Sequence, residues 1–206
     1  MKFGKVNVSA GTNSKLGRHI WSINLPAGKS CNPDAPCRKI CYALKGRYLF
    51  KNVIVPREEN YLLWLTDPAA YEEGCNIAAD NVEWLRFHDS GDIPDPAYLQ
   101  MMCRVAENHD SCRFLAFTKQ YGFVNDFLAN GGIIPENLNI VFSVWDGWEC
   151  QNPFNLPTAH VRLKAGNVFP IPGDAHECPK FCGACVYGEK SCWSLTRGES
   201  VVFNQH

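Results

Sequence analysis

Short apolar segments alternate with helical segments along this chain, and this alternation limits the folds open to it. Strands are predicted at residues 19–25, 82–87, 112–117, 139–144, 160–163 and 168–171, and helices at 56–65, 68–80, 95–108 and 123–129. Strands separated by helices pair in parallel, and strands that are apolar throughout have both faces covered. A complete eight-unit barrel takes about 250 residues, more than the 206 here. We therefore expect an α/β fold, a partial parallel β/α barrel of about five to six strands.

The composition is that of an ordinary core-forming protein. Hydrophobic residues make up 46% and charged residues 20%, which excludes a disordered chain. No apolar run reaches the roughly 18 residues of a membrane span, and the first residues lack the apolar stretch of a secretory signal. We expect a cytoplasmic protein with no membrane partner, with the barrel over residues 1–172 and a cysteine-rich, metal-binding tail over residues 173–206.

The first cysteine group directly follows the first predicted strand. The chain has eleven cysteines, and Cys31, Cys37 and Cys41 have the spacing C-x5-C-x3-C. In a reducing compartment, clustered cysteines indicate metal ligands before disulfides. Three soft ligands without an obvious fourth suit a site with an open coordination position. Such a site is either a [4Fe–4S] cluster with one free iron or a zinc ion that holds a water molecule.

The second cysteine group lies in the tail and is complete in itself. Cys178, Cys182, Cys185 and Cys192 have the spacing C-x3-C-x2-C-x6-C. Four thiolates close a coordination sphere, so we expect either structural zinc or a fully ligated second [4Fe–4S] cluster, and the spacing does not distinguish them. Cys150, in a polar loop, is a further candidate ligand.

Polar residues gather just after the predicted strands, where parallel folds place their active sites. The densest run is His88-Asp89-Ser90-Gly91-Asp92, and Lys119, Ser143 and Asp146 follow later strands. The run supplies carboxylates, a hydroxyl and a histidine that can bond a substrate or shuttle a proton. Helix capping is the alternative explanation, but it leaves His88 and Asp89 without a role.

The charge is unevenly distributed along the chain. Residues 1–60 hold 11 Lys and Arg against 3 Asp and Glu, a net of +8, whereas residues 61–206 hold 9 against 18, a net of −9. The basic third contains the first cysteine group. This distribution indicates either an anionic partner, such as a nucleotide or nucleic acid, or compensation for an anionic thiolate–metal site.

The loop that ends in Cys41-Tyr42-Ala43 resembles the cysteine loop of the radical SAM superfamily. The usual spacing there is C-x3-C-x2-C with an aromatic residue before the last cysteine, whereas the gaps here are five and three and Tyr42 follows Cys41. The resemblance implies that a [4Fe–4S] cluster at the first cysteine group binds S-adenosylmethionine through its open iron. Reduction by a donor such as flavodoxin or ferredoxin then gives a 5′-deoxyadenosyl radical, which abstracts hydrogen from the substrate.

The same resemblance implies roles for the residues at the strand ends. Cofactor binding falls to Tyr42, His88, Asp89, Ser90, Gly91, Asp92, Ser143 and Asp146, and catalysis to His88, Asp89 and Lys119. Auxiliary clusters are common in the tails of radical SAM enzymes, so the resemblance favours a second [4Fe–4S] cluster over zinc at the second cysteine group.

Nearly the full length of the chain also resembles an uncharacterised bacteriophage gene-product family. The shared segments are residues 25–31, 37–43, 86–92, 117–119 and 142–144 and the closing cysteine cluster. This resemblance implies a phage origin, hence the host cytoplasm, and gives no substrate. The substrate expected is a small molecule or, from the phage origin and the basic first third of the chain, a nucleotide or nucleic-acid base. Two alternatives remain: a zinc-binding module for nucleic acid or a host protein, and an iron–sulfur protein that does not use S-adenosylmethionine.

Overall fold

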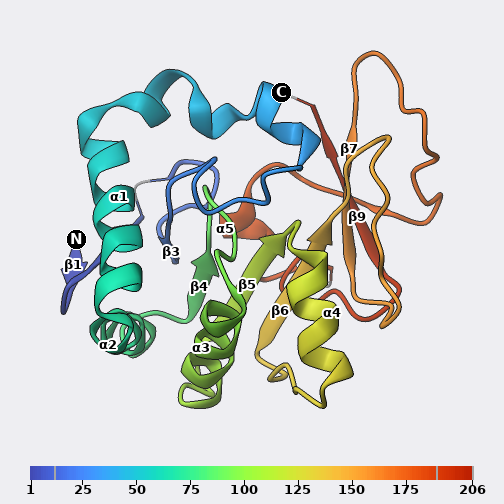
Figure 1. Ribbon diagram of the computed structural model, residues 1–206. Helices are drawn as coiled ribbons and strands as arrows, with labels where there is room; N and C mark the ends of the chain where they lie inside the picture. Colours follow the sequence, from blue (N-terminus) through green and yellow to red (C-terminus); the bar gives the residue numbers. More distant parts are fainter. Residues whose placement is uncertain (12, 189, 206) are drawn as a thin grey trace.

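The computed structural model describes residues 1–11, 13–188 and 190–205. At its centre is one nine-stranded sheet with the order β1-β2-β3-β4-β5-β6-β7-β9-β8 (Figure 1). The strands are β1 (Lys2–Phe3), β2 (Val6–Ala10), β3 (Ile20–Ile23), β4 (Trp84–Phe87), β5 (Arg113–Thr118), β6 (Leu138–Ser143), β7 (Thr158–Arg162), β8 (His176–Glu177) and β9 (Ser200–Asn204). Neighbouring strands are parallel from β3 to the far edge at β8, whereas β1 and β2 add an antiparallel edge.

The mixed α/β class and the parallel pairing are confirmed. Five predicted strands form, and they correspond to β3, β4, β5, β6 and β7. The strand predicted at 168–171 is wrong, because this segment is a loop whose first two N–H groups are bonded by the carboxylate of Asp146. The sequence did not reveal β1 and β2 because they lie at an edge and alternate only weakly, nor β9, which has an apolar run of three residues.

A barrel is not confirmed. The two edges of the sheet, β1 and β8, stand at opposite ends of the strand order, and each has one neighbour. The sheet is also larger than predicted, because both ends of the chain add strands to it. The N-terminal residues supply β1 and β2, and the cysteine-rich tail supplies β8 and β9.

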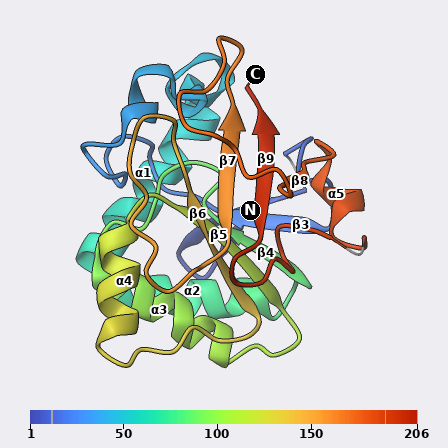
Figure 2. The same ribbon diagram turned by 90° about the vertical axis from the view of Figure 1, so that its right-hand side faces the viewer.

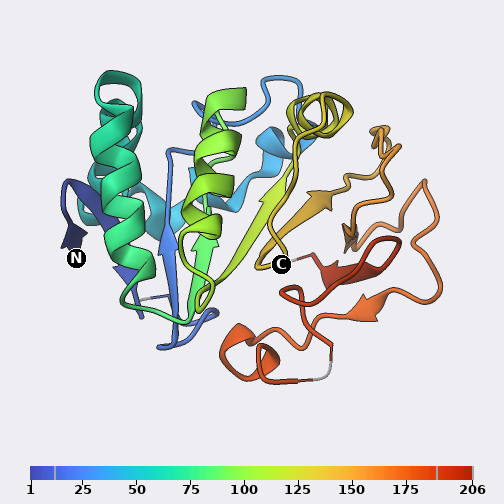
Figure 3. The ribbon, with the colours of Figure 1, turned by 90° about the horizontal axis from the view of Figure 1, so that it is seen from below.

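Four helices cover one face of the sheet, as Figure 3 shows in teal to yellow. They are α1 (Lys51–Thr66), α2 (Pro68–Ala79), α3 (Pro96–Glu107) and α4 (Tyr121–Ala129). As predicted, Asp95 caps α3 by accepting from the Tyr98 N–H, and Pro96 takes the first position. The start predicted for α1 is wrong, since Pro56 lies inside the helix. No helix among the described residues is long and apolar enough to cross a membrane.

The tail covers the opposite face of the sheet. Figures 2 and 3 show its short helix α5 (Cys182–Cys185), in red-orange, on the side away from α1 to α4, and β9 beside β7. Leu115 and Val141, on neighbouring strands, pack there against Leu195 and the half-buried Cys178 and Cys192. Both faces of the central strands are therefore covered, as their apolar sequences predicted.

Candidate functional site

The first cysteine group lies above the carboxyl ends of the strands. After β3 the chain crosses this edge of the sheet in three 3₁₀ turns, η1 (Pro36–Ile40), η2 (Tyr42–Leu44) and η3 (Gly46–Leu49), and then enters α1. Figure 1 shows this segment in blue and cyan above the tips of β4 and β5. We refer to residues 26–50 as the cysteine loop. Cys41 joins η1 to η2, so its position is set by a turn on each side.

The three thiols of the cysteine loop are close enough to affect one another. The pKa of Cys31 is raised to about 11, mainly by burial, and the two other thiols contribute to this rise. Burial also raises the pKa of Cys37, and Cys41 adds to that rise. The N–H of Gly28 donates to Cys31 Sγ at 3.4 Å, a bond that favours the thiolate. A thiolate in this group disfavours the next one, and a bound cation would remove that penalty.

Neither cysteine group is assembled around a metal position. Among the described residues, no three His, Cys, Asp or Glu side chains are placed so that they could hold one metal ion. Thiols are ligands that both zinc and iron–sulfur clusters take. A metal at either cysteine group therefore stays a prediction.

Asp89 anchors the cysteine loop from below. Its carboxylate is buried, with Oδ1 paired to Arg57 Nη2 of α1 at 3.1 Å and Oδ2 accepting from Asn13 Nδ2 at 2.9 Å. Its backbone carbonyl accepts a hydrogen bond from Tyr42 Oη. Both Asp89 and Tyr42 therefore use their polar atoms inside the protein, where they tie α1 and the cysteine loop to the end of β4.

Gly91 and Ser90 bring the turn after β4 against the start of the cysteine loop. Gly91 has a φ of 84°, and a Cβ there would lie 2.7 Å from both the Leu25 carbonyl oxygen and Ser30 Oγ. Only glycine meets both conditions. Ser90 Oγ donates to the same Leu25 carbonyl at 3.0 Å. The turn thus holds Ser30, the residue directly before Cys31.

Asp92 is a buried hydrogen-bond centre between the cysteine loop and β5. Its N–H donates to Ser30 Oγ at 3.1 Å. Its carboxylate accepts from Thr118 Oγ1 at 2.6 Å and from the Lys119 N–H at 2.9 Å. Burial raises the pKa of Asp92, and the bond from Thr118 opposes that rise. Asp92 therefore links the cysteine loop to the end of β5 through its hydrogen bonds.

The side chain of His88 points into the core and not toward the cysteine loop, where proton transfer was predicted. Its ring packs on Tyr98 of α3, with Nε2 3.1 Å from Tyr98 Oη, and it is 3% exposed. Nδ1 is buried without a hydrogen-bond partner among the described residues. Burial lowers the pKa of His88 to about 3. The ring is therefore neutral at ordinary pH.

Lys119 and Ser143 contact each other at the rim of the site. Lys119 Nζ donates to Ser143 Oγ at 2.6 Å and lies 5.8 Å from the centroid of the Trp145 ring. The charge of Lys119 lowers the pKa of Cys37 against the larger effect of burial, so this ammonium group lies near the thiols. Lys119 is half-buried, and its backbone carbonyl accepts from Asn32 Nδ2 of the cysteine loop at 3.4 Å.

Asp146 stands apart from the other predicted site residues. Its carboxylate accepts from the N–H groups of Val168 and Phe169 at 2.9 and 2.8 Å. These bonds lower the pKa of Asp146 and hold the loop after β7. The contacts of this side chain are therefore with that loop.

The tail thiols form a second group on the face of the sheet opposite α1 to α4. The pKa of Cys192 is raised to about 12, mainly by burial, and Cys178, Cys182 and Cys185 each contribute to this rise. Lys180 has a φ of 74°, and its N–H donates to Cys178 Sγ at 3.4 Å. A residue with a side chain adopts this conformation at a cost of about 1 to 2 kcal/mol. The backbone of Lys180 therefore adopts an intrinsically unfavourable conformation beside Cys178 Sγ.

Arg86 lies between the two cysteine groups, and sequence reasoning missed it. Its Nε donates to the His88 carbonyl at 3.1 Å, and its guanidinium lies 4.9 Å from the centroid of the Phe117 ring. Burial raises the pKa values of Tyr42, Cys182 and Cys192, and the charge of Arg86 opposes that rise in all three. The available signal was a cation inside the otherwise apolar strand Trp84–Phe87.

Cys150 lies beside Tyr121 at the Lys119 side of the site. The pKa of Cys150 is raised to about 11, mainly by burial, and the neighbouring Tyr121 hydroxyl and the charge of Lys119 oppose the rise. Tyr121 Oη donates its hydrogen to the Ser143 carbonyl at 2.6 Å. The candidate ligand predicted in the polar loop is therefore near the site, and a role as ligand stays a prediction.

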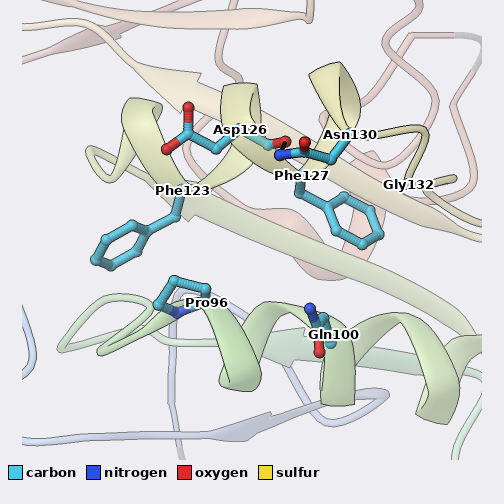
Figure 4. A pocket seen from close by; sticks show the side chains of 7 residues that line it. All are labelled: Pro96, Gln100, Phe123, Asp126, Phe127, Asn130 and Gly132. Atoms are coloured by element: carbon cyan, nitrogen blue, oxygen red, sulfur yellow. Dashed lines mark hydrogen bonds between the residues drawn. The ribbon is translucent and has the colours of Figure 1, made fainter.

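Two hollows in the described surface lie elsewhere. Figure 4 shows one between α3 and α4, lined by Pro96, Gln100, Phe123, Asp126, Phe127, Asn130 and Gly132. The other lies beside β7 and is lined by Val144, Asp146, His160, Val161, Asn167, Phe169, Pro170 and Ile171. Neither lining includes a cysteine, and the second includes Asp146, one of the predicted site residues.

Comparison with known proteins gives one match. The family model described as Gene product 88, a phage-type family, matches residues 2–152. This stretch contains the cysteine loop and the turn after β4, and it ends before the tail cysteines. No curated protein and no solved structure matches the chain, and the comparisons give no support to a radical SAM relationship. Since the match covers most of its length, the chain belongs to the Gene product 88 family.

Proposed function

We propose that this protein is an iron–sulfur enzyme of the radical SAM type, with a cluster held by Cys31, Cys37 and Cys41. One observation carries the proposal: the three thiols share a braced loop that covers the carboxyl ends of parallel strands. Parallel α/β folds bind substrates at this edge. The open side of a three-cysteine site leaves a position for a ligand from outside the chain.

When bound, a cluster with one open iron would supply the reductive cleavage of S-adenosylmethionine to a 5′-deoxyadenosyl radical. The contacts of Asp89 and Asp92 support a positioning role, because their carboxylates are fully engaged by Arg57, Asn13 and the end of β5. Gly91 positions the loop by close approach. These residues hold the thiols in place and need not touch the cofactor.

Lys119 is the residue best placed to bind an anionic group. Its ammonium is half-buried at the rim and is bonded to a neutral hydroxyl, Ser143 Oγ. A carboxylate or phosphate would form a stronger, charge-assisted bond at the same position. We assign this position to the carboxylate of S-adenosylmethionine or to an anionic substrate such as a nucleotide.

The tail is proposed to hold its own metal, either zinc or a second [4Fe–4S] cluster. Four thiols lie in one group and need no outside ligand. A turn at Lys180 directs a backbone N–H to Cys178 Sγ, and such a bond stabilises a thiolate. The tail packs on the face of the sheet opposite α1 to α4, so this metal would stabilise the fold.

Metal analysis tests both sites. The protein is purified without oxygen and reconstituted, and iron, sulfide and zinc are measured per chain. About eight iron and eight sulfide indicate two clusters, and about four with one zinc indicate a cluster in the loop and zinc in the tail. Cleavage of S-adenosylmethionine is then measured with dithionite as reductant. Zinc without iron, or iron without cleavage, overturns the proposal.

Variants assign the metal to each site. Replacement of Cys31, Cys37 and Cys41 by alanine should remove about four iron per chain and all cleavage, while the tail keeps its metal. The matched control is Cys103→Ala, which removes a buried thiol on α3 outside both groups. Loss of all metal from a folded triple variant would contradict two separate sites.

A further inference from the structure

Two half-buried cations, Arg86 and Lys15, lie on the face of the sheet that the tail covers. Leu85 and Phe87 of β4 point into the core under the helices. Side chains along a strand alternate between its two faces, so Arg86 points to the other face. Lys15 belongs to the turn between β2 and β3, and its carbonyl accepts from the Cys182 N–H of the tail at 2.9 Å. One cation is therefore held by the sheet and the other by a turn that contacts the tail.

A pair of aromatic rings brings the two cations together. Phe117 of β5 and Phe203 of β9 meet edge to face, 5.7 Å apart between centroids, and both pack beside the tail. Arg86 Cζ lies 4.9 Å from the centroid of Phe117, and Lys15 Nζ lies 5.2 Å from that of Phe203. Burial raises the pKa of Cys182, and the charges of Arg86 and Lys15 both oppose that rise. Both cations are therefore close to the same thiol.

Neither cation has an anionic partner in the described part of the chain. Arg86 uses only Nε, which donates to the His88 carbonyl, whereas its two Nη groups and Lys15 Nζ form no hydrogen bond or ion pair there. None of these three nitrogens is among the fully buried atoms without a partner, so each reaches solvent. The apolar rings around them lower the local dielectric, which strengthens the attraction to an incoming anion.

The arrangement of these cations fits a phosphate monoester. A guanidinium that stacks on a ring keeps its edge free, and this edge can bond two phosphate oxygens at once. A phosphate monoester carries a charge of about −1.5 to −2 at pH 7, which matches the two cations. A carboxylate or a phosphodiester carries a single negative charge and would leave one cation without a counter-charge.

We propose that Arg86 and Lys15 bind a phosphate monoester group of the substrate, between the cysteine loop and the tail. The inference rests on the proposed function only in taking the bound molecule as the substrate. It adds an anion position separate from that of Lys119, whose ammonium is bonded to Ser143 Oγ. Arg86 bonds the carbonyl that follows β4, so the phosphate lies at the carboxyl edge of the sheet, which the cysteine loop crosses.

Titration calorimetry of the metal-loaded protein with thymidine 5′-monophosphate tests the proposal. Thymidine, which lacks the phosphate, should bind at least about tenfold more weakly. An oligothymidylate without terminal phosphates offers only diesters and should also bind more weakly than the monophosphate. Equal binding of thymidine, tighter binding of the oligonucleotide, or no binding of the monophosphate overturns the proposal.

Variants locate the phosphate. Arg86→Gln and Lys15→Gln each remove one charge and should each weaken binding of the monophosphate at least about tenfold. Arg86→Lys keeps the charge but loses the planar fork, and should recover part of the affinity. The matched control is Arg113→Gln, which makes the same change at the start of β5, at the opposite edge of the sheet. Full affinity in both glutamine variants, or equal weakening by the control, overturns the proposal.

Metal analysis separates phosphate binding from charge compensation of the tail thiols. If the two cations were only counter-charges, the glutamine variants would lose tail metal and keep full affinity for the monophosphate, which would overturn the proposal. Circular dichroism checks the fold of each variant, and Lys15→Gln, in a turn, carries the test if Arg86→Gln does not fold. Lack of S-adenosylmethionine cleavage by the unaltered protein overturns the proposed function, whereas lack of phosphate binding overturns only this inference.

Discussion

The cysteine loop and the cysteine tail occupy different surfaces of the same sheet and are held by different means. The loop crosses the carboxyl edge and is fastened by buried polar residues, above all Asp89 and Asp92. The tail covers an apolar face, where Trp84 meets the rings of Trp193 and Tyr187 at 5.3 and 6.1 Å between centroids. Hydrogen bonds and a buried ion pair hold the cysteine loop, whereas apolar packing holds the tail.

This difference indicates different roles for two similar groups of thiols. Polar contacts fix the cysteine loop where the strands end and leave its outer side exposed, which suits the proposed active site. Apolar packing joins the tail to the core, which suits the proposed structural metal. The comparison therefore predicts that stability depends on the tail thiols and that reactivity depends on the loop thiols.

The largest effect should come from the tail thiols. Cys182→Ser in the metal-loaded protein should lower the free energy of unfolding by about 3 kcal/mol or more, because metal binding in such a site is part of folding. The matched variant Cys37→Ser in the loop should cost less than about 1 kcal/mol. Chemical denaturation followed by circular dichroism measures both. Equal losses would break the comparison.

The next effect concerns the buried ion pair below the loop. Asp89→Asn leaves Arg57 without its counter-charge and should cost about 3 to 4 kcal/mol, since both side chains are nearly buried. Glu72→Gln, in the exposed pair with Arg104, should cost less than about 1 kcal/mol. Urea unfolding gives both values. If the two variants cost the same, Asp89 does not brace the loop.

A smaller loss of stability should follow from adding a Cβ atom at Gly91. Gly91→Ala combines a φ of 84° with a Cβ 2.7 Å from Ser30 Oγ, and should cost about 2 to 3 kcal/mol. Gly131→Ala has nearly the same φ, 82°, but no heavy atom within 4 Å, and should cost about 1 kcal/mol. The difference between the two unfolding energies measures the close approach alone. No difference would mean that the loop is free to shift.

The smallest effect is a change in pH dependence. The folded-state pKa of His88 is about 3, below the ordinary value of 6.5, so the unfolded chain binds a proton that the folded chain does not. Stability should therefore fall as the pH falls from about 6.5 toward 3, with a slope of up to about 1.4 kcal/mol per pH unit. His88→Asn should flatten this slope, because asparagine tolerates the φ of 67° at this position and does not titrate.

The control for this prediction is His19→Asn, which removes an exposed histidine. It should leave the pH dependence unchanged. Unfolding free energies measured between pH 7 and pH 4.5 compare the two variants with the unaltered protein. The same slope in all three would show that His88 takes up its proton in the folded state, and hence that its ring reaches water.

Local sequence patterns predicted the central part of the fold. Apolar segments between helices correctly predicted parallel strands, and Asp95 with Pro96 marked the start of α3. The patterns failed at the chain ends for two reasons. The segment that forms β2 alternates only weakly, although its partner strand β3 is near in sequence. The short apolar run of β9 pairs with β7, from which the loops and cysteines of the tail separate it. Pro56 led to a wrong start for α1. Proline favours the first turn of a helix, but in α1 it lies inside the helix, which begins at Lys51.

The sequence by itself determined which residues have chemistry to offer: two spaced groups of thiols and a polar run at the end of a strand. Only the tertiary structure decided how the polar run is used. Asp89 is engaged by Arg57 and by Asn13, which lie 32 and 76 residues away in the chain, and His88 by Tyr98 of a helix. Burial and hydrogen-bond partners decide whether a polar group braces the fold or stays free to react, and both come from distant segments.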